Sequence, residues 1–288
     1  MVKLIDNKLK CNAINNLISI MMKKKWFKLQ SVALYLLLTL LTYYAPALML
    51  FYLVCGVYDV SRNSNLDLSL LRRYFLGNGL LTWFLAPVNF LMDLLTLPFV
   101  NKKIYQLYDL PIDCQQEIAR ILEVVKSQNI LNELTGRVEN VNRGMIFFKW
   151  YGKNIDNFID VPVFHEDYKY IKTIGISVFN KRVRTREHFG PLRATLRLLY
   201  NINDVSDRGS FIKVRSIENH WCDNKLFIFD DTLSHQSFNE TDGIRYCLFV
   251  DILRPSRCNF VLEFFVRSIA TVTEKIKFIF YNHWVPLK

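Results

Sequence analysis

Paired cysteines are missing from this chain. The spacing of its six cysteines predicts neither a disulfide framework nor a metal-binding finger: Cys11, Cys55, Cys114, Cys222, Cys247 and Cys258. Such a scattered set is typical of reduced thiols in a protein that faces the cytosol. The chain also lacks an RNA-binding aromatic strand and a basic recognition helix. We therefore expect no nucleic acid among its partners, although its formal net charge is +11.

Charge is missing altogether between Val32 and Cys55. About 20 apolar residues cross a bilayer, so this run predicts a transmembrane helix over residues 32–55. Pro46 is expected to kink it, which helices embedded in lipid tolerate. The run is too long and begins too far into the chain for a cleavable secretory signal, which we do not expect.

A second apolar stretch extends from Leu76 to Val100 and is interrupted by Pro87, Asp93 and Pro98. Three interpretations remain open. It forms a second span that closes a hairpin, it lies in the membrane interface, or it is a buried helix pair of the soluble part. The sequence is 51% hydrophobic and strongly basic, a combination that favours an anionic membrane surface as a partner.

Hydrophobic periodicity changes from helical to alternating between residues 140 and 255, which predicts a mainly β sandwich or barrel. Residues 101–137 are expected to be helical, with Pro111 to Val125 at the centre. Residues 259–284 predict an amphipathic helix that either lies on a membrane or caps the barrel. The expected strands are 145–151, 171–180, 193–202, 211–216, 225–230 and 244–252.

These patterns divide the chain into three parts. Residues 1–100 are the basic, membrane-anchoring region, and residues 101–258 are a catalytic domain with a helical lead-in. Residues 259–288 are the amphipathic, membrane-associating C-terminal helix.

Two histidines and an arginine form the candidate site. His188 opens the run His188-Phe189-Gly190-Pro191, and His235 ends the run Phe229-Asp230-Asp231-Thr232-Leu233-Ser234-His235, ten residues before Arg245. Neutral imidazoles suit Fe(II), and a guanidinium enclosed in a barrel suits a carboxylate, to which its planar fork donates two hydrogen bonds.

The alternation of side chains along a strand predicts which face each arginine occupies. Within 244–252, Arg245 shares one face with Cys247, Phe249 and Asp251. Arg197 likewise shares a face with neighbours two residues away in its strand. An arginine on an apolar strand needs an anion, so both are candidate ligand-binding residues.

These motifs carry a resemblance. The chain resembles the aspartyl/asparaginyl β-hydroxylase superfamily of Fe(II)/2-oxoglutarate dioxygenases, over residues 145–258, and is most similar to the bacterial branch that hydroxylates a fatty acyl chain of lipid A. The resemblance implies a double-stranded β-helix, that is, a jelly-roll or cupin-like barrel with flanking helices. It also implies Fe(II) as the metal, 2-oxoglutarate as cosubstrate and O2 as oxidant.

The resemblance also assigns residues. His188 and His235 would ligate iron, and Arg245 would clamp the far carboxylate of 2-oxoglutarate, assisted by Ser177. Arg197 would lie near the other end of the cosubstrate.

Two positions depart from the family pattern. Gly190 stands where the lipid-modifying branch has a carboxylate ligand, and Leu199 stands where the family has a histidine near the cosubstrate. His165 and His220 lie outside the motifs and are expected to be surface or hydrogen-bonded residues. Asp230 and Asp231 are expected to cap a turn and support His235 rather than act as bases.

The resemblance predicts a membrane-associated dioxygenase that hydroxylates an aliphatic C–H of a lipid acyl chain. A peptidyl aspartyl/asparaginyl hydroxylase is the first alternative, because that branch has the His-x-Gly-Pro motif. A scaffold whose iron site has decayed is the second, because of Gly190 and Leu199.

The expected localisation is the inner (cytoplasmic) membrane, with the catalytic domain facing the cytosol. Seven lysines in residues 1–30 should stay cytoplasmic. A hairpin, or one span with a re-entrant segment, would return the domain to the side where 2-oxoglutarate is made. A single span would place it on the other side.

Overall fold

The computed structural model describes residues 36, 38–97, 101–127, 130–138, 141–275 and 285–287. The chain divides into two compact units, Met1–Val54 and Cys55–Lys288. In the first unit the described residues are helical, with a break at Ala45 just before Pro46, where a kink was expected. Helix α2 (Pro46–Ser61) begins there and continues into the second unit.

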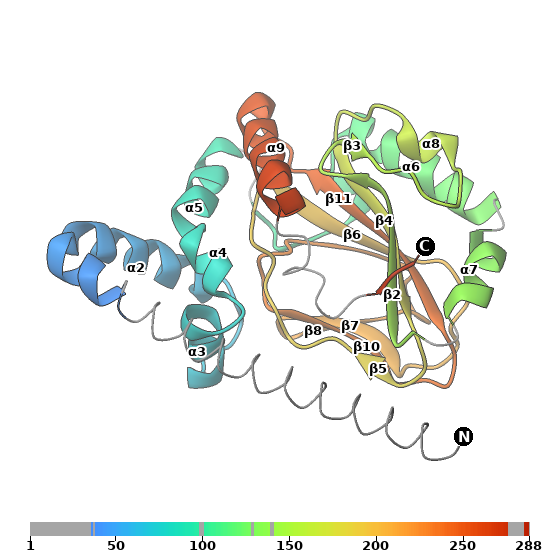
Figure 1. Ribbon diagram of the computed structural model, residues 1–288, viewed down its shortest axis with the longest axis horizontal. Coiled ribbons are helices and arrows are strands. Elements are labelled where there is room, and N and C mark those ends of the chain that lie inside the picture. The colour runs from blue at the N-terminus through green and yellow to red at the C-terminus, as the bar shows by residue number, and fades with distance from the viewer. Residues whose placement is uncertain are drawn as a thin grey trace, which may run out of the picture. The chain divides into compact units, whose positions relative to one another are not determined.

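The second unit is built on two largely antiparallel sheets that face each other (Figure 1), and one pair at an edge of the larger sheet is parallel. The larger sheet has the order β1-β9-β6-β11-β4-β2-β12, with β3 beside β2, and the smaller has the order β5-β10-β7-β8. The strands of the larger sheet are β1 (Ile104–Tyr105), β2 (Arg143–Trp150), β3 (Lys153–Asn154), β4 (Ile171–Phe179), β6 (Thr195–Asn201), β9 (Leu226–Phe229), β11 (Arg245–Leu253) and β12 (Val285–Pro286). Those of the smaller sheet are β5 (Val183–Arg184), β7 (Ser210–Val214), β8 (Ile217–His220) and β10 (His235–Asn239).

The chain alternates between these sheets from β4 to β11. Strand β4 pairs with β11 and β6 with β9 in the larger sheet, while β5 pairs with β10 and β7 with β8 in the smaller. This connectivity is a jelly roll, so the predicted mainly β, double-stranded β-helix fold is confirmed. The six expected strands are present as β2, β4, β6, β7, β9 and β11, but β8 and β10 were missed.

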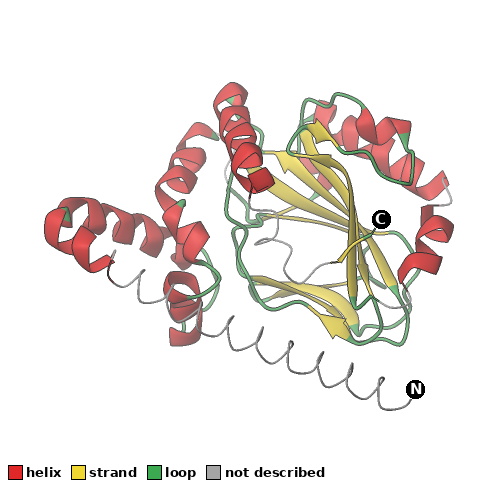
Figure 2. Ribbon diagram, in the orientation of Figure 1, coloured by secondary structure: helices red, strands yellow, loops and turns green. Residues whose placement is uncertain are grey.

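The main core lies between the outer face of the larger sheet and the helices that cover it (Figure 2). These are η1 (Leu107–Asp109), α6 (Ile112–Ser127), α7 (Ile130–Val138) and α8 (Pro162–His165). Alternate residues of β4, Ile174, Ile176 and Val178, are fully buried under them. Each contributes about 1.5–3 kcal/mol of apolar burial. The intervening residues of β4, including Ser177, therefore face the barrel interior.

The second apolar stretch folds into helical segments that contact the barrel. Its residues form the end of α3 (Leu68–Leu76), α4 (Leu80–Phe84) and α5 (Ala86–Leu95), and residues 98–100 lie outside the described part. Asn89 is fully buried, accepts a hydrogen bond from the Arg193 N–H (2.8 Å) and donates one to the Pro191 carbonyl (3.2 Å). Asp93 binds Arg193 (2.6 Å) and Arg254 (3.1 Å). These contacts favour the third interpretation, helices of the soluble part, because the polar interruptions bind the barrel.

No helix among the described residues is long and apolar enough to cross a membrane. The expected span over 32–55 is therefore not found there, although residues 32–35 and 37 lie outside the description.

Helix α9 (Asn259–Lys275) crosses one end of the barrel (Figure 1). Leu262 and Val266 are buried with Met92 of α5 and Leu253 of β11, as a capping helix requires. Phe260, by contrast, is 76% exposed, and Phe264 on the next turn is exposed as well. The helix thus caps the domain with one face and leaves an aromatic face open, while the expected continuation over 276–284 lies outside the described residues.

Candidate functional site

The two candidate histidines lie side by side. His188 and His235 form an isolated β-bridge in which each backbone N–H donates to the other's carbonyl at 3.0 Å. Their ring centroids are 4.2 Å apart. The Nδ1 of His188 lies 2.8 Å from the Arg186 carbonyl, and the Nδ1 of His235 lies 2.8 Å from the Leu233 carbonyl. A carbonyl can only accept, so each Nδ1 carries the proton and each Nε2 keeps a free lone pair.

Both imidazoles are neutral in this setting. Burial lowers the pKa of His188. Burial, followed by the neighbouring His188, lowers the pKa of His235 well below its usual range. The unprotonated ring is the form that binds a metal, so the pair is ready to act as ligands at neutral pH.

Asp231 fills the space that a side chain at position 190 would occupy. Its Oδ1 lies 3.4 Å from His235 Nε2, and its Oδ2 lies 3.2 Å from an Arg197 nitrogen. A Cβ on Gly190 would collide with the Asp231 carboxylate. The Gly190 N–H also donates to the Asp231 carbonyl at 2.7 Å, so the backbones are in contact too. The carboxylate expected from position 190 is thus replaced in space by one from position 231.

No three or more His, Cys, Asp and Glu side chains in the described ranges are grouped as a metal site. Asp231 is turned toward Arg197, while its buried Oδ1 accepts no hydrogen bond from the described residues. The donors nevertheless suit iron, because two neutral imidazole nitrogens and one carboxylate oxygen are the ligand types of non-heme Fe(II) oxygenases.

Arg197 is paired with protein carboxylates. Its Nε donates to Asp251 at 2.7 Å, and its guanidinium also stacks 3.9 Å from the Phe249 ring centre. Burial alone would lower the pKa of Arg197, but Asp231 and Asp251 raise it above the usual value. Arg197 therefore holds Asp231 in place here. Leu199, two residues on, packs in the apolar interior, where the family has a histidine.

Arg245 is a buried cation, and two of its guanidinium nitrogens have no hydrogen-bond partner among the described residues. It is 1% exposed, and its Nε and Nη1 have no hydrogen-bond partner within the described part of the chain. Its guanidinium lies 4.1 Å from the Phe179 ring centre and 5.4 Å from that of Trp221, whose Nε1 also lacks a partner there. Burial lowers the pKa of Arg245 to about 10, so it stays charged at neutral pH. A buried charge without a partner is costly, and this position is therefore suited to an anion.

Ser177 faces the same interior. It pairs with Cys247 across β4 and β11, and its hydroxyl donates to the Cys247 carbonyl at 3.2 Å. Cys247, Trp221 and Phe229 belong to one interior cluster, and the Phe229 ring lies 5.2 Å from that of His235. The structure thus places the histidine pair and the Arg245 position along one apolar interior.

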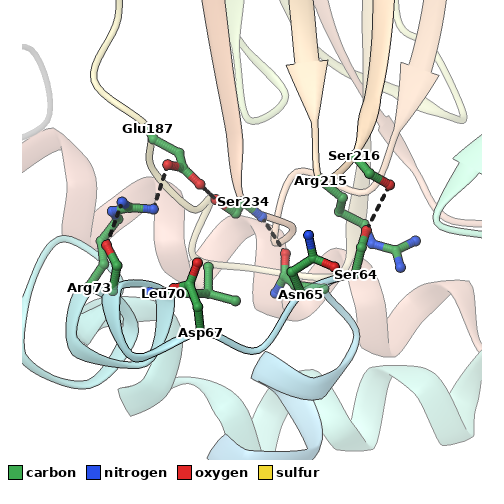
Figure 3. A pocket seen from close by; sticks show the side chains of 11 residues that line it. Ser64, Asn65, Asp67, Leu70, Arg73, Glu187, Arg215, Ser216 and Ser234 are labelled. Carbon is green, nitrogen blue, oxygen red and sulfur yellow. Dashed lines mark hydrogen bonds and ion pairs between the residues drawn. The ribbon is translucent and has the colours of Figure 1, made fainter.

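A small polar pocket of about 180 Å³ lies beside the segments that carry the histidines, and hydrogen bonds between its lining residues hold these segments (Figure 3). Glu187 accepts from Arg73 of α3 at 2.6 Å and from the Ser234 hydroxyl. The Ser234 N–H donates to Asn63 at 2.9 Å. Sequence reasoning missed these residues and Trp221. Glu187 and Ser234 each stand directly before a histidine, a signal that could have found them.

The other titratable candidates lie outside the histidine pair, as expected. His220 binds the Arg208 carbonyl through Nδ1, and the His165 carbonyl accepts from Asn154. Asp230 caps its turn by accepting from the N–H and hydroxyl of Thr232.

Asp230 also forms the centre of a buried ion network. It binds Arg62 at 2.7 Å and approaches Arg193 at 3.5 Å, and both Asp230 and Arg193 are fully buried. Arg193 in turn pairs with Asp59 and Asp93. The network joins the helical segments to the loop that precedes His235.

Asp230→Asn is expected to lower the free energy of unfolding by about 3–5 kcal/mol at pH 7, because it leaves buried arginines unmatched. Burial opposes ionisation, but Arg62 and Arg193 hold the pKa of Asp230 below its usual range. The stabilisation is therefore present above the unfolded pKa of about 3.9 and is lost as pH falls further. Urea unfolding of both proteins at pH 7 and at about pH 2 measures it, because the loss falls below the unfolded pKa. Equal stabilities at pH 7 would contradict the network's role.

Part of the chain matches a known protein family and a curated relative. A family model described as aspartyl/asparaginyl beta-hydroxylase matches residues 123–255. A curated relative, the ornithine lipid ester-linked acyl 2-hydroxylase of Rhizobium tropici, is 32% identical over 117 residues, which are 39% of this chain. The matched segment covers 41% of that relative, less than half its length.

Solved structures match only distantly. The protein TT1209 from Thermus thermophilus has a TM-score of 0.28 and 11% identity, over 45% of this chain and 99% of its own. An oxalate oxidase bound to glycolate has a TM-score of 0.28 and 8% identity, over 42% of this chain and 56% of its own. Scores this low support no inference. The family model and the curated relative support the resemblance seen in the sequence motifs: residues 123–255 of the chain are similar to the aspartyl/asparaginyl β-hydroxylase family.

Proposed function

We propose that this protein is an Fe(II)/2-oxoglutarate-dependent dioxygenase that hydroxylates an aliphatic C–H of a lipid acyl chain, similar to those of lipid A. Its family supports a hydroxylase, and its relative from Rhizobium tropici is named an acyl 2-hydroxylase. The observation that carries the proposal is the pair of neutral imidazoles, His188 and His235, whose Nε2 atoms are free beside the Asp231 carboxylate.

The residues present fit an iron ion. His188 and His235 would hold it, and Asp231 would supply the carboxylate that Gly190 lacks. The chemistry that Fe(II) supplies when bound is oxygen activation coupled to oxidative decarboxylation of 2-oxoglutarate, which gives succinate and CO2. The backbone carbonyls behind both Nδ1 atoms fix the ring orientations, as outer partners of metal ligands do.

The remaining interior residues bind the cosubstrate and exclude water. Arg245 would clamp the far carboxylate of 2-oxoglutarate, with the Ser177 hydroxyl assisting across the strand pair. Arg197 has a different role from the expected one in this arrangement, since it orients Asp231 and reaches the cosubstrate only if that pair opens. Phe249, stacked beside Arg197, keeps the interior apolar.

Asp231→Ala is expected to weaken metal binding by roughly 10–100-fold, since residues that orient or complete a ligand set have effects of that order. Anaerobic titration with Co(II), followed by its visible absorption, measures the affinity without turnover. Asp242→Ala removes an exposed carboxylate that pairs with Arg182, and serves as the matched control. Unchanged Co(II) affinity in Asp231→Ala would remove Asp231 from the iron site.

Exposed apolar side chains support a membrane lipid as the substrate. Leu91 and Leu94 of α5 and Phe260 and Phe264 of α9 are exposed, although the two helices pack together through Met92 and Leu262. Such a surface on a chain of net charge +11 suits an anionic membrane. We therefore propose association with the inner membrane and a domain that faces the cytosol, where 2-oxoglutarate is available.

The peptidyl aspartyl/asparaginyl hydroxylase remains the second candidate, favoured by the motif His188-Phe189-Gly190-Pro191. Purified protein with Fe(II), ascorbate and 2-oxoglutarate can be offered bacterial membrane lipids or Asp- and Asn-containing peptides. Succinate formation stimulated by lipid supports the proposal, whereas stimulation by peptide alone supports the alternative. Absence of succinate in both arms would favour the decayed scaffold.

A further inference from the structure

A charged cavity of about 550 Å³ opens beside α9, at the end of β2 and the start of β4. Ligand pockets have volumes of this order. Four cations and two carboxylates line it: Lys149, Lys153, Lys172, Arg267, Asp167 and Glu263. The excess of positive charge suits an anion.

Lys149 is the residue that most needs such an anion. Its side chain is on β2, is 2% exposed, and donates to the Asn154 side chain at 2.6 Å. It forms no ion pair with any residue that the structure describes. Lys172, by contrast, is bound to Glu263 at 2.6 Å. Burial lowers the pKa of Lys149; the Asp167 carboxylate opposes this shift and Lys172 adds to it. The cavity's four cations exceed its two carboxylates, so it keeps an excess of positive charge that a bound anion can match.

Tyr151 connects this cavity to the candidate iron site. It lines the cavity, is partly buried, and interacts electrostatically with Asp251, Arg197 and Asp231. Its φ of +45° is a left-handed conformation that side chains other than glycine seldom adopt. Tyr151 and Gly152 form the two-residue turn between β2 and β3, where positive φ angles are usual hairpin geometry. A molecule that fills the cavity therefore borders the residues that hold Asp231.

We propose that this cavity binds the anionic headgroup of the lipid substrate, through Lys149 and Lys172, while the acyl chain extends past Tyr151 toward His188 and His235. The inference rests on the proposed function and names where that substrate's polar end is held. The shared chemistry is that of a phosphate or carboxylate group, to which ammonium groups donate charge-assisted hydrogen bonds.

The test is a binding titration of the full chain in a non-ionic detergent, without iron or 2-oxoglutarate. The probes are a short-chain anionic phospholipid, dihexanoyl phosphatidic acid, its zwitterionic counterpart dihexanoyl phosphatidylcholine, and inorganic phosphate. Lys149→Met keeps the length of the buried side chain and removes its charge. Lys153→Met changes an exposed cation at the same cavity, and Lys181→Met removes one at the distant β4–β5 turn as the matched control.

Dihexanoyl phosphatidic acid is expected to bind more tightly than either other probe. Lys149→Met should weaken its binding by roughly tenfold or more, while Lys181→Met leaves it unchanged. Lys153→Met should weaken binding in the same direction, which keeps the test valid if Lys149→Met fails to fold. Equal affinity for inorganic phosphate would assign the cavity to a free anion and overturn the headgroup proposal. Binding unaffected by either cavity variant would overturn the site. Because no turnover is measured, these failures are separate from a failure of the dioxygenase proposal.

Discussion

His235→Ala is expected to abolish succinate formation from 2-oxoglutarate. His235 supplies one of two imidazoles that face each other with ring centres 4.2 Å apart, and its removal leaves His188 as the only histidine beside Asp231 among the described residues. A single imidazole and a carboxylate bind Fe(II) too weakly to keep it in place during turnover. Succinate release and bound iron are measured together on the purified variant.

His220→Ala is the matched control, since His220 lies on β8 and binds the Arg208 carbonyl away from the pair. It should keep both iron and activity. Normal iron content in His235→Ala, with the parent active, would show that the metal is held elsewhere and would refute the assignment of this pair.

Arg245→Met is expected to raise the 2-oxoglutarate concentration needed for half-maximal turnover by about 100-fold or more. Removing one partner of a buried charged pair costs about 2–5 kcal/mol, and each 1.4 kcal/mol corresponds to tenfold. Methionine keeps an apolar side chain between the Phe179 and Trp221 rings, so the fold should tolerate it. Iron affinity should change little, because Arg245 is not among the metal donors.

The control for Arg245 is Arg208→Met, which removes an exposed arginine that pairs with Asp223. The measurement is the dependence of succinate formation on 2-oxoglutarate concentration. A lower maximal rate with an unchanged requirement for 2-oxoglutarate would contradict the cosubstrate role of Arg245 and indicate a structural one.

A mainly β sandwich or barrel could be predicted because its long strands alternate with period two, and the family resemblance implied the jelly roll. In β11, Leu248 and Val250 pack under the helices while Arg245 and Cys247 face the interior, as the pattern of 244–252 indicated. Strand β10 was missed, since its five residues, His235–Asn239, are mostly polar and give no apolar alternation.

The role of Asp231 could not be read from spacing. Position 190, where the lipid-modifying branch has a carboxylate ligand, is a glycine in this sequence. Only the fold shows that the turn before β10 brings the Asp231 carboxylate into the space beside Gly190. The bridge between His188 and His235, which joins residues 47 positions apart, is equally invisible to local pattern.

The sequence left the second apolar stretch open between a membrane span, an interfacial helix and buried helices for a related reason. Hydropathy detects Leu-rich helices but does not reveal which polar residues within them have partners. Asn89 and Asp93 looked like defects of a membrane span, yet their contacts with Pro191, Arg193 and Arg254 attach α5 to the barrel.

Mass spectrometry of membrane lipids tests the central claim most directly. Bacteria that express the full chain, the His235→Ala variant or no added protein are grown alike, and their lipids are extracted and fragmented. The account predicts a lipid that gains one oxygen atom on an acyl chain with the parent protein and not with His235→Ala. Identical acyl chains in all three extracts would contradict it. The parent protein purified from the same cells must then convert 2-oxoglutarate to succinate with a peptide, which shows that it is active.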